Sequence, residues 1–227
     1  MAYSGNNLAL HEEIVLLALE DRKGTFQWSL GAPIIGAAVF AELLLTERVT
    51  IDESEKDPLV DVVDDEPLGN PILDEALERV ATANRRARLS KWISRLGNRK
   101  HLARDIAREL CRRGILREDE KSVLLFFRRT IYPEVNPVPE RRLVQRLEKA
   151  IFSDGRVDDR TAVLVALANT AGVLHHAIDK GRLKKRKKRI ERITKESEVG
   201  AAAKRVVDAT LAALMAVTAT TTIVTSS

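Results

Sequence analysis

Apolar residues recur at three- and four-residue intervals along most of this 227-residue chain. That spacing places them on one face of a helix, as expected for amphipathic helices packed on a core. Gly24, Gly114 and Gly155 stand where three of these patterns end, and Pro71 and Pro139 stand where two begin. The pattern predicts helices over 10–23, 71–83, 102–113, 139–154, 34–45, 161–178 and 199–217.

Short β-branched stretches interrupt this helical pattern. Residues 49–51 and 60–63 can pair as a small hairpin across an acidic, loop-rich stretch. The apolar run 123–127 is followed by three prolines within seven residues, which preclude a continuing helix, so we expect a strand there. The predicted fold class is mostly α: a single globular helical domain with small β-hairpins, one of them projecting and hydrophobic. We expect a disordered N-terminus over 1–7, the domain over 8–218 and a tail over 219–227.

Positive charge is concentrated in one segment. The chain has 38 Lys and Arg against 33 Asp and Glu, a net charge of +5, and residues 180–195 alone contribute +9. Such a run attracts nucleic acid or acidic lipid headgroups, although a solvated helix end explains it equally well. The predicted basic surface consists of Lys184, Lys185, Arg186, Lys187, Lys188 and Arg189.

The sequence offers little for catalysis. A single cysteine, Cys111, excludes a disulfide framework and any multi-cysteine metal site. His11 begins a pattern like that of zinc proteases, but Val15 stands where the second histidine would be. His175 and His176 provide two ligands at most, whereas a catalytic metal needs about three. We therefore expect no enzyme, no cofactor and no metal site.

A stripe of positive charge marks the expected helix 102–113 and the residues before it. Lys100, Arg104, Arg108 and Arg112 are four positions apart and would share one helix face. Like charges at this spacing disfavour an isolated helix by roughly 0.2–0.5 kcal/mol per pair. An anion-binding face and a solvated amphipathic face fit this stripe equally well.

The apolar run after this helix needs a cover if it projects from the domain. Burial of Leu125, Phe126 and Phe127 in a bilayer or against another subunit would contribute about 1.5–3 kcal/mol each. Arg128 and Arg129 would then lie at the level of lipid headgroups. An internal core strand is the alternative that the local sequence favours narrowly.

The order and spacing of five stretches resemble the Golgi phosphoprotein 3 family, from about residue 8 to residue 217. The stretches are LHEEIVLLALEDRKG (10–24), AELLLTERVTID (41–52), GNPILDEAL (69–77), ARELCRRGILREDEKSVLLF (107–126) and the apolar helix after Asp159. The resemblance implies a non-enzymatic, mostly helical peripheral membrane protein with a basic pocket for phosphatidylinositol 4-phosphate. It also implies a projecting hairpin, matched here by 122–136, that contacts the membrane and mediates self-association. Eukaryotic members retain glycosyltransferases in the Golgi by binding their cytosolic tails.

The family's headgroup pocket is matched only in part. Trp28 matches its tryptophan, and Lys100 stands at the first of two pocket arginines. The second falls on Ala103, beside Arg104, and a further family arginine falls on Gly36 or a neighbour that is not basic. Because lysine is a point charge rather than a bidentate fork, this pattern favours general attraction to acidic phospholipid over a specific pocket.

We therefore predict a peripheral membrane adaptor on the cytosolic face of a membrane, at the Golgi in a eukaryote or at the inner membrane in a bacterium. Headgroup binding is assigned to Trp28, Lys100, Arg104 and Arg108, and membrane or oligomer contact to Leu124, Leu125, Phe126 and Phe127. The expected partners are anionic phospholipid, cytosolic tails of membrane proteins and further copies of the chain. The alternative is a helical nucleic-acid-binding protein that uses the run 180–195, but such a protein has no use for the apolar hairpin. A third option is a scaffold whose basic helix binds an acidic partner.

Overall fold

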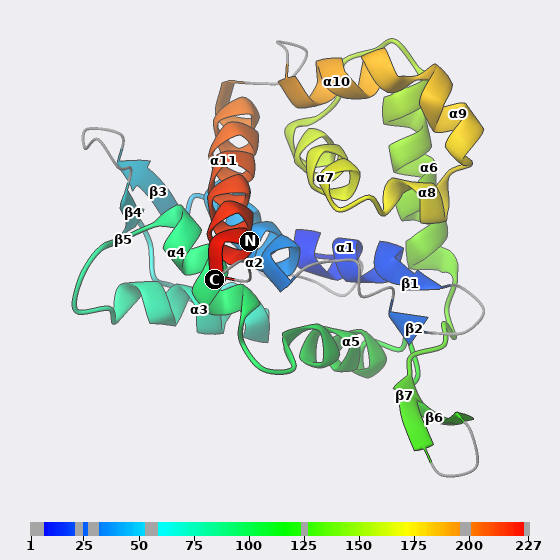
Figure 1. The fold of residues 1–227 in the computed structure, drawn as a ribbon, viewed down its shortest axis with the longest axis horizontal. Coiled ribbons are helices and arrows are strands. Elements are labelled where there is room, and N and C mark those ends of the chain that lie inside the picture. The colour runs from blue at the N-terminus through cyan, green and yellow to red at the C-terminus, as the bar shows by residue number, and fades with distance from the viewer. Residues whose placement is uncertain are drawn as a thin grey trace.

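Two buried helices, α1 (Leu10–Ala18) and α2 (Ala32–Leu45), form the centre of the molecule (Figure 1). The structure is a computed structural model that describes residues 7–20, 25–26, 32–52, 59–123, 127–195 and 201–224. Every side chain of α1 is buried, and the described side chains of α2 are buried over 34–43. Both helices are rich in Leu, Ile, Val and Ala, so their burial follows directly from their composition.

The other helices cover these two on different sides. Helices α3 (Pro71–Ala81), α4 (Leu89–Gly97) and α11 (Ala201–Val224) pack against α2, and α7 (Asp159–Thr170) packs against both central helices. Helices α5 (Leu102–Arg112), α6 (Val138–Phe152) and α8 (Leu174–Ala177) pack against α1. The remaining helices are α9 (Lys180–Lys185) and α10 (Lys187–Lys195). The predicted mostly α fold is confirmed.

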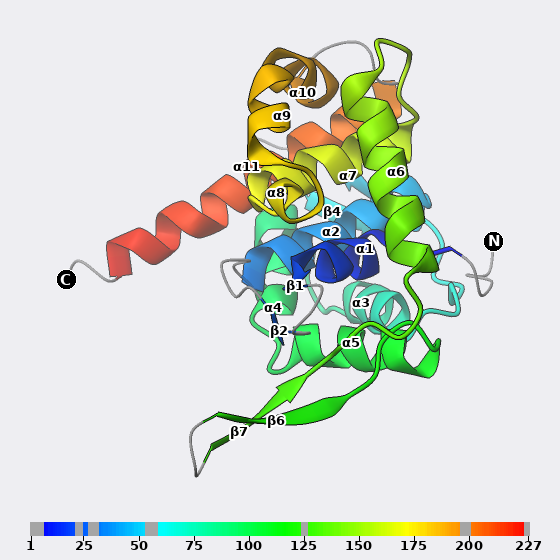
Figure 2. The ribbon, with the colours of Figure 1, turned by 90° about the vertical axis from the view of Figure 1, so that its right-hand side faces the viewer.

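The strands are short and antiparallel. Strand β1 (Leu19–Glu20) pairs with β2 (Thr25–Phe26), and β3 (Val49–Asp52), β4 (Leu59–Val62) and β5 (Ala87–Arg88) form a three-stranded sheet. The register places Val49 opposite Val62, which confirms the small hairpin predicted from these two stretches. A third pair, β6 (Asp119–Val123) and β7 (Phe127–Ile131), forms a hairpin that projects from the body (Figure 2).

Local sequence explains several helix ends. Asn70 caps α3, since its Oδ1 accepts hydrogen bonds from the backbone N–H groups of Ile72 and Leu73 at 3.1 and 3.2 Å, and Pro71 starts the helix. Gly114 follows α5 with a φ of 68°, a conformation that glycine adopts without strain. The starts predicted for α3 and the end predicted for α5 are therefore confirmed.

Three predicted helix limits are wrong. The first helix ends at Ala18, not near residue 23, because Leu19 and Glu20 pair with β2 instead of continuing the helix. The helix predicted over 161–178 ends at Thr170, and a new one begins at Leu174 after Gly172 takes a φ of 69°. The last helix continues past 217 to Val224. Within the described ranges, no helix has the length and apolar character needed to cross a bilayer.

Candidate membrane-binding surface

Helix α5 and the β6–β7 hairpin lie at the same end of the molecule (Figures 1 and 2). The chain passes directly from α5 into the hairpin, and Leu116 forms an isolated β-bridge with Glu134 at the hairpin base. Strand β2 also packs against β7, which brings the residues after α1 to this end. The stripe of positive charge on α5 and the projecting hairpin are thus neighbours in space.

The apolar face of α5 fixes the direction of its charges. Leu102, Ile106 and Leu110 are buried on the side where α5 packs against α1. Arg104, Arg108 and Arg112 are exposed, as the four-residue spacing predicts. Lys100 is exposed too, but it stands in the turn before the helix, where His101 has a φ of 67°. The stripe of four therefore consists of three helical residues and one turn residue.

Arg108 is held by a carboxylate at the start of the hairpin. Its Nη2 and Nε donate to Glu118 Oε1 at 3.1 and 3.2 Å, and the Tyr132 hydroxyl donates to the same oxygen at 3.1 Å. The Arg108 hydrogen bond holds the pKa of Glu118 below its ordinary value. Burial, together with the bond to Glu118, raises the pKa of Tyr132 to about 12. The predicted headgroup contact Arg108 is therefore already engaged within the protein.

Other basic residues near α5 also form ion pairs, which leaves two basic residues as candidates for binding an external anion. Arg112 pairs with Glu109, and Arg99 pairs with Asp105 at 3.0 Å. Lys100 and Arg104 are exposed and have no ion pair within the part of the chain that the structure describes. These two side chains are the strongest candidates for binding an external anion.

The single strand predicted over 123–127 is not what the described residues show. We expected one strand over 123–127, but β6 ends at Val123 and β7 begins at Phe127, and the two residues face each other in the register. The predicted contacts Leu124, Leu125 and Phe126 lie outside the described residues, as does the side chain of Phe127. The described strands run from 119 to 131, so the hairpin begins earlier and ends earlier than the predicted 122–136.

The structure leaves no room for a side chain at Gly36, one of the positions on which the family's α2 arginine falls. A Cβ atom at Gly36 would lie 2.5 Å from the backbone oxygen of Ile93 and 3.1 Å from the backbone nitrogen of Gly97. At Gly36 the backbones of α2 and α4 are therefore in close contact. Ala103 is buried, and Trp28, the predicted aromatic contact, lies outside the described residues.

The predicted basic surface of 184–189 is only partly on the surface. Arg189 is 2% exposed and donates to the backbone oxygens of Ala150 and Gly155, so its assignment to the basic surface is wrong. Arg186 donates to the Ile151 oxygen at 2.8 Å and is half-buried. These two arginines tie α9 and α10 to the end of α6. The exposed members of the set are Lys184, Lys185, Lys187 and Lys188.

This basic segment also lies far from the hairpin. Helices α9 and α10 are at the top of the molecule in Figures 1 and 2, whereas β6 and β7 extend from the bottom. A flat surface that touches the hairpin and α5 cannot also touch α9 and α10. This arrangement argues against a contribution of the run at the same membrane surface, which stays a prediction to be tested.

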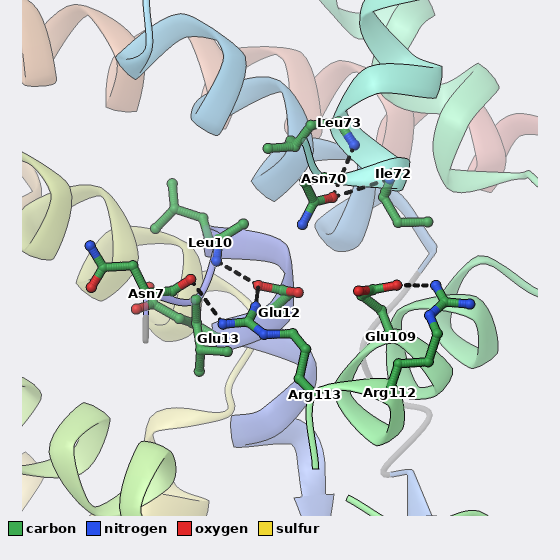
Figure 3. A network of polar contacts seen from close by, with 12 residues as sticks. Asn7, Leu10, Glu12, Glu13, Asn70, Ile72, Leu73, Glu109, Arg112 and Arg113 are labelled. Atoms are coloured by element: carbon green, nitrogen blue, oxygen red, sulfur yellow. Dashed lines mark hydrogen bonds and ion pairs between the residues drawn. The ribbon is translucent and has the colours of Figure 1, made fainter. Parts of the chain in front are cut away.

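A network of buried charges surrounds the first residues of the domain, and sequence reasoning missed it. Glu12 is fully buried and pairs at 2.7 Å with Nη1 of Arg113, which follows α5 (Figure 3). Nη2 of the same arginine donates to the backbone oxygen of Asn7 at 3.1 Å. One guanidinium thus fixes both the first turn of α1 and the residues that lead into it.

The second part of this network joins α1 to α2, α6 and α7. Glu13 pairs with Arg146 at 2.7 Å, and Glu42 pairs with Arg160 at 2.5 Å. Arg160 also donates to the Leu8 oxygen at 2.6 Å. Burial raises the pKa of Glu13, although both arginines act against that shift. Carboxylates inside two apolar helices were the signal in the sequence, since such groups are rarely buried without a partner.

His11 stands beside this network without a partner of its own. It is fully buried, and neither ring nitrogen has a hydrogen-bond partner in the described part of the chain. Burial lowers the pKa of His11 against the opposing effect of the Glu12 and Glu42 carboxylates, and the Arg160 and Arg113 charges add to the lowering. The histidine is thus kept neutral in the core, and the described ranges contain no cluster of three potential metal ligands around it or elsewhere.

Comparison with known proteins found two similarities. The model of the family described as Golgi phosphoprotein 3 (GPP34) matches residues 10–210. Among curated proteins, the chain is similar to vacuolar protein sorting-associated protein 74 of Schizosaccharomyces pombe. The two are 26% identical over a region that covers 82% of this chain and 65% of the relative. This chain therefore matches less than two thirds of that protein.

Proposed function

Because the chain belongs to the Golgi phosphoprotein 3 family, we propose that it is a peripheral membrane protein that binds anionic phospholipid and acts as an adaptor rather than an enzyme. The observation that supports this proposal best is the position of α5 beside the β6–β7 hairpin. One surface of the molecule thereby presents exposed cationic side chains next to a projecting hairpin that carries the apolar run.

Lys100 and Arg104 are the side chains that bind lipid phosphates in this proposal. Both are exposed and neither forms an ion pair with a described carboxylate, so an approaching phosphate does not have to break one. Each basic residue near an anionic surface contributes about 1 kcal/mol of attraction. Arg129, exposed on β7, adds to the positive field on the same side.

The lipid we propose is acidic phospholipid in general. A phosphoinositide pocket built as in the family would need basic side chains that positions 36 and 103 do not supply, since Gly36 abuts the backbone of α4 and Ala103 is buried. Trp28 keeps its proposed role of packing against headgroups. Leu124, Leu125, Phe126 and Phe127 keep their proposed role of entering the bilayer or contacting another copy of the chain.

We infer the adaptor role from membership of the family. We propose that the bound protein recruits cytosolic tails of membrane proteins, that it self-associates through the hairpin, and that it resides on the cytosolic face of a membrane. The Golgi is the corresponding membrane in a eukaryote, as the family name indicates, and the inner membrane is its counterpart in a bacterium.

Flotation with liposomes tests the proposal. Vesicles of phosphatidylcholine alone are compared with vesicles containing phosphatidylserine, phosphatidylglycerol or phosphatidylinositol 4-phosphate at equal surface charge and fixed salt. We expect recovery with all three acidic vesicles and little with neutral ones. The double variant Lys100→Gln and Arg104→Gln should lose most of this recovery, whereas Arg141→Gln and Arg142→Gln on α6 remove the same charge elsewhere. Equal recovery on neutral and acidic vesicles would refute the electrostatic part.

The hairpin is tested separately. Replacing Phe126 and Phe127 with Ser should weaken flotation or lower the mass seen by sedimentation, because both roles proposed for the hairpin depend on its apolar side chains. If neither measurement changes, the hairpin has neither role.

A further inference from the structure

A cavity of about 570 Å³ lies among α2, α3, α4 and the residues that join α3 to β5. The cavity lies away from the β6–β7 hairpin (Figure 1), and none of its lining residues is assigned to membrane binding. Its volume falls within the range of about 300–1,000 Å³ that is usual for pockets that bind small molecules. Phe40, Ala76, Ala83 and Leu96 give it an apolar floor.

The charged side chains that line the cavity are all arginines. Arg79, Arg85 and Arg95 contribute to the wall, together with Thr82 and Asn84, and no carboxylate lines it among the described residues. Arg79 shares its charge with Glu75 at 2.6 Å, outside the lining. Arg85 is exposed and has no ion pair in the described ranges. The cavity therefore carries a positive field that the protein itself neutralises only in part.

Trp92 forms part of the cavity wall. Its side chain is 6% exposed and lines the cavity, yet its Nε1–H donor has no acceptor among the described residues. Buried tryptophan usually has a hydrogen-bond partner for this group. The Arg95 guanidinium lies over the indole ring at 4.9 Å, which holds the arginine beside the opening. Because Nε1 itself is closed to solvent, Trp92 contributes to the cavity through its ring and through the arginine held over that ring.

We propose that this cavity binds an organic oxyanion, a phosphate or carboxylate attached to an apolar group. Arg85 and Arg95 bind the anion, since guanidinium forks match the geometry of phosphate and carboxylate oxygens. The apolar group of the ligand packs against the apolar floor of the cavity, beside the Trp92 ring in the wall. This site is independent of the proposed membrane binding and can succeed or fail without it.

Isothermal titration calorimetry with phenyl phosphate tests the proposal, because this probe combines both halves of the expected ligand. Inorganic phosphate and benzyl alcohol serve as probes of each half alone. We expect saturable binding of phenyl phosphate, at least tenfold tighter than either half. The chain has two tryptophans, so the Trp28→Phe variant leaves Trp92 as the sole emitter, and its fluorescence should change over the same concentration range. No saturable heat with phenyl phosphate would overturn the proposal.

Variants locate the binding. Arg85→Gln and Arg95→Gln should each weaken phenyl phosphate binding at least tenfold, while Lys91→Gln, an exposed residue on the same helix outside the cavity, should leave it within twofold. Thermal melts confirm that each variant is folded. Equal losses in all three would show nonspecific charge attraction and contradict the site. With binding established, a phosphotyrosine peptide that binds tenfold tighter than phenyl phosphate identifies a protein segment as the source of the anion, and equal or weaker binding identifies a small metabolite.

Discussion

Nη1 of Arg160, at the start of α7, lies 2.5 Å from Oε1 of Glu42, a fully buried carboxylate on α2. The other oxygen of Glu42 accepts the backbone N–H of Leu10 at 2.6 Å, so the pair connects three elements. We expect Arg160→Met to lower the free energy of unfolding by about 3–5 kcal/mol, because it strands a buried charge. Denaturant unfolding followed by circular dichroism measures this change.

The matched control is Arg117→Met, which breaks an exposed pair with Asp119 at 3.2 Å. Exposed pairs contribute at most about 1 kcal/mol, so this variant should unfold near the wild-type midpoint. Similar losses of unfolding free energy in the two variants would mean that burial of Glu42 does not make its ion pair more important for stability than an exposed pair.

The buried His11 predicts a loss of stability in acid. Because burial lowers its pKa below the ordinary 6.5, the unfolded chain takes up a proton that the folded chain refuses. Stability from this group is complete above pH 6.5 and declines as pH falls toward the folded pKa. His11→Met should flatten that decline, seen as melting temperatures between about pH 7.5 and 5.

Glu13 acts in the opposite direction and must be separated from this effect. Its pKa is raised above 4.5, so its contribution is complete below pH 4.5 and is lost as pH rises through the folded pKa. The difference between wild type and His11→Met cancels Glu13, which both proteins share. Parallel curves for the two proteins would contradict the role of His11.

Close contact between α2 and α4 predicts that position 36 tolerates no side chain. Gly36→Ala should lower the free energy of unfolding by about 1–3 kcal/mol, since its methyl group would press on the Ile93 backbone oxygen. Gly155→Ala is the control, because a Cβ there meets nothing within 4 Å. Thermal unfolding of both variants distinguishes packing from a general effect of replacing glycine.

The Arg108–Glu118 pair predicts a variant with increased membrane binding. Glu118→Gln removes the carboxylate that neutralises Arg108 and should strengthen partitioning onto acidic vesicles about fivefold, since one basic residue near the surface contributes about 1 kcal/mol. Glu148→Gln frees Arg182 of α9 at the far end and should change nothing. Vesicle titrations measure the partition coefficients of both variants. Equal coefficients for Glu118→Gln and Glu148→Gln would contradict the prediction.

The position of α9 and α10 predicts that their lysines are dispensable for membrane binding. Replacing Lys184, Lys185, Lys187 and Lys188 together by Gln should leave flotation on acidic vesicles within twofold at physiological salt, where charges beyond about 8 Å are largely screened. A large loss would show that this end faces the bilayer instead. Gel-shift assays on the same variant test the nucleic-acid alternative, which requires these lysines.

Periodicity identified most helices because their burial is set by local spacing. The apolar positions Leu102, Ile106 and Leu110 all face the core, as four-residue spacing requires. The early end of α1 escaped prediction because Leu19 and Glu20 follow their pairing with β2, a tertiary contact that overrides local preference for helix. Residue 172 could have been read as a break, since glycine is rare inside helices.

The sequence predicted which charged residues lie on the candidate surface, but not which of them form ion pairs within the protein. Arg104 and Arg108 are equivalent in the four-residue pattern, and only the fold reveals that Glu118 takes one of them. Arg189 is equally inconspicuous within a run of basic residues, yet it caps the carbonyl oxygens at the end of α6. Partners that are ten or more residues away cannot be assigned from spacing on one helix.

The charge network around α1 also sets an order of events during synthesis. Glu12, Glu13 and Glu42 pair with arginines that stand 101, 133 and 118 residues later in the chain. Until the ribosome has delivered Arg113 and Arg146 for α1 and Arg160 for α2, these two helices carry acids with no counter-charge and cannot settle into an apolar interior. The first helix made is therefore among the last to take its final place, and the nascent chain must keep it hydrated until then.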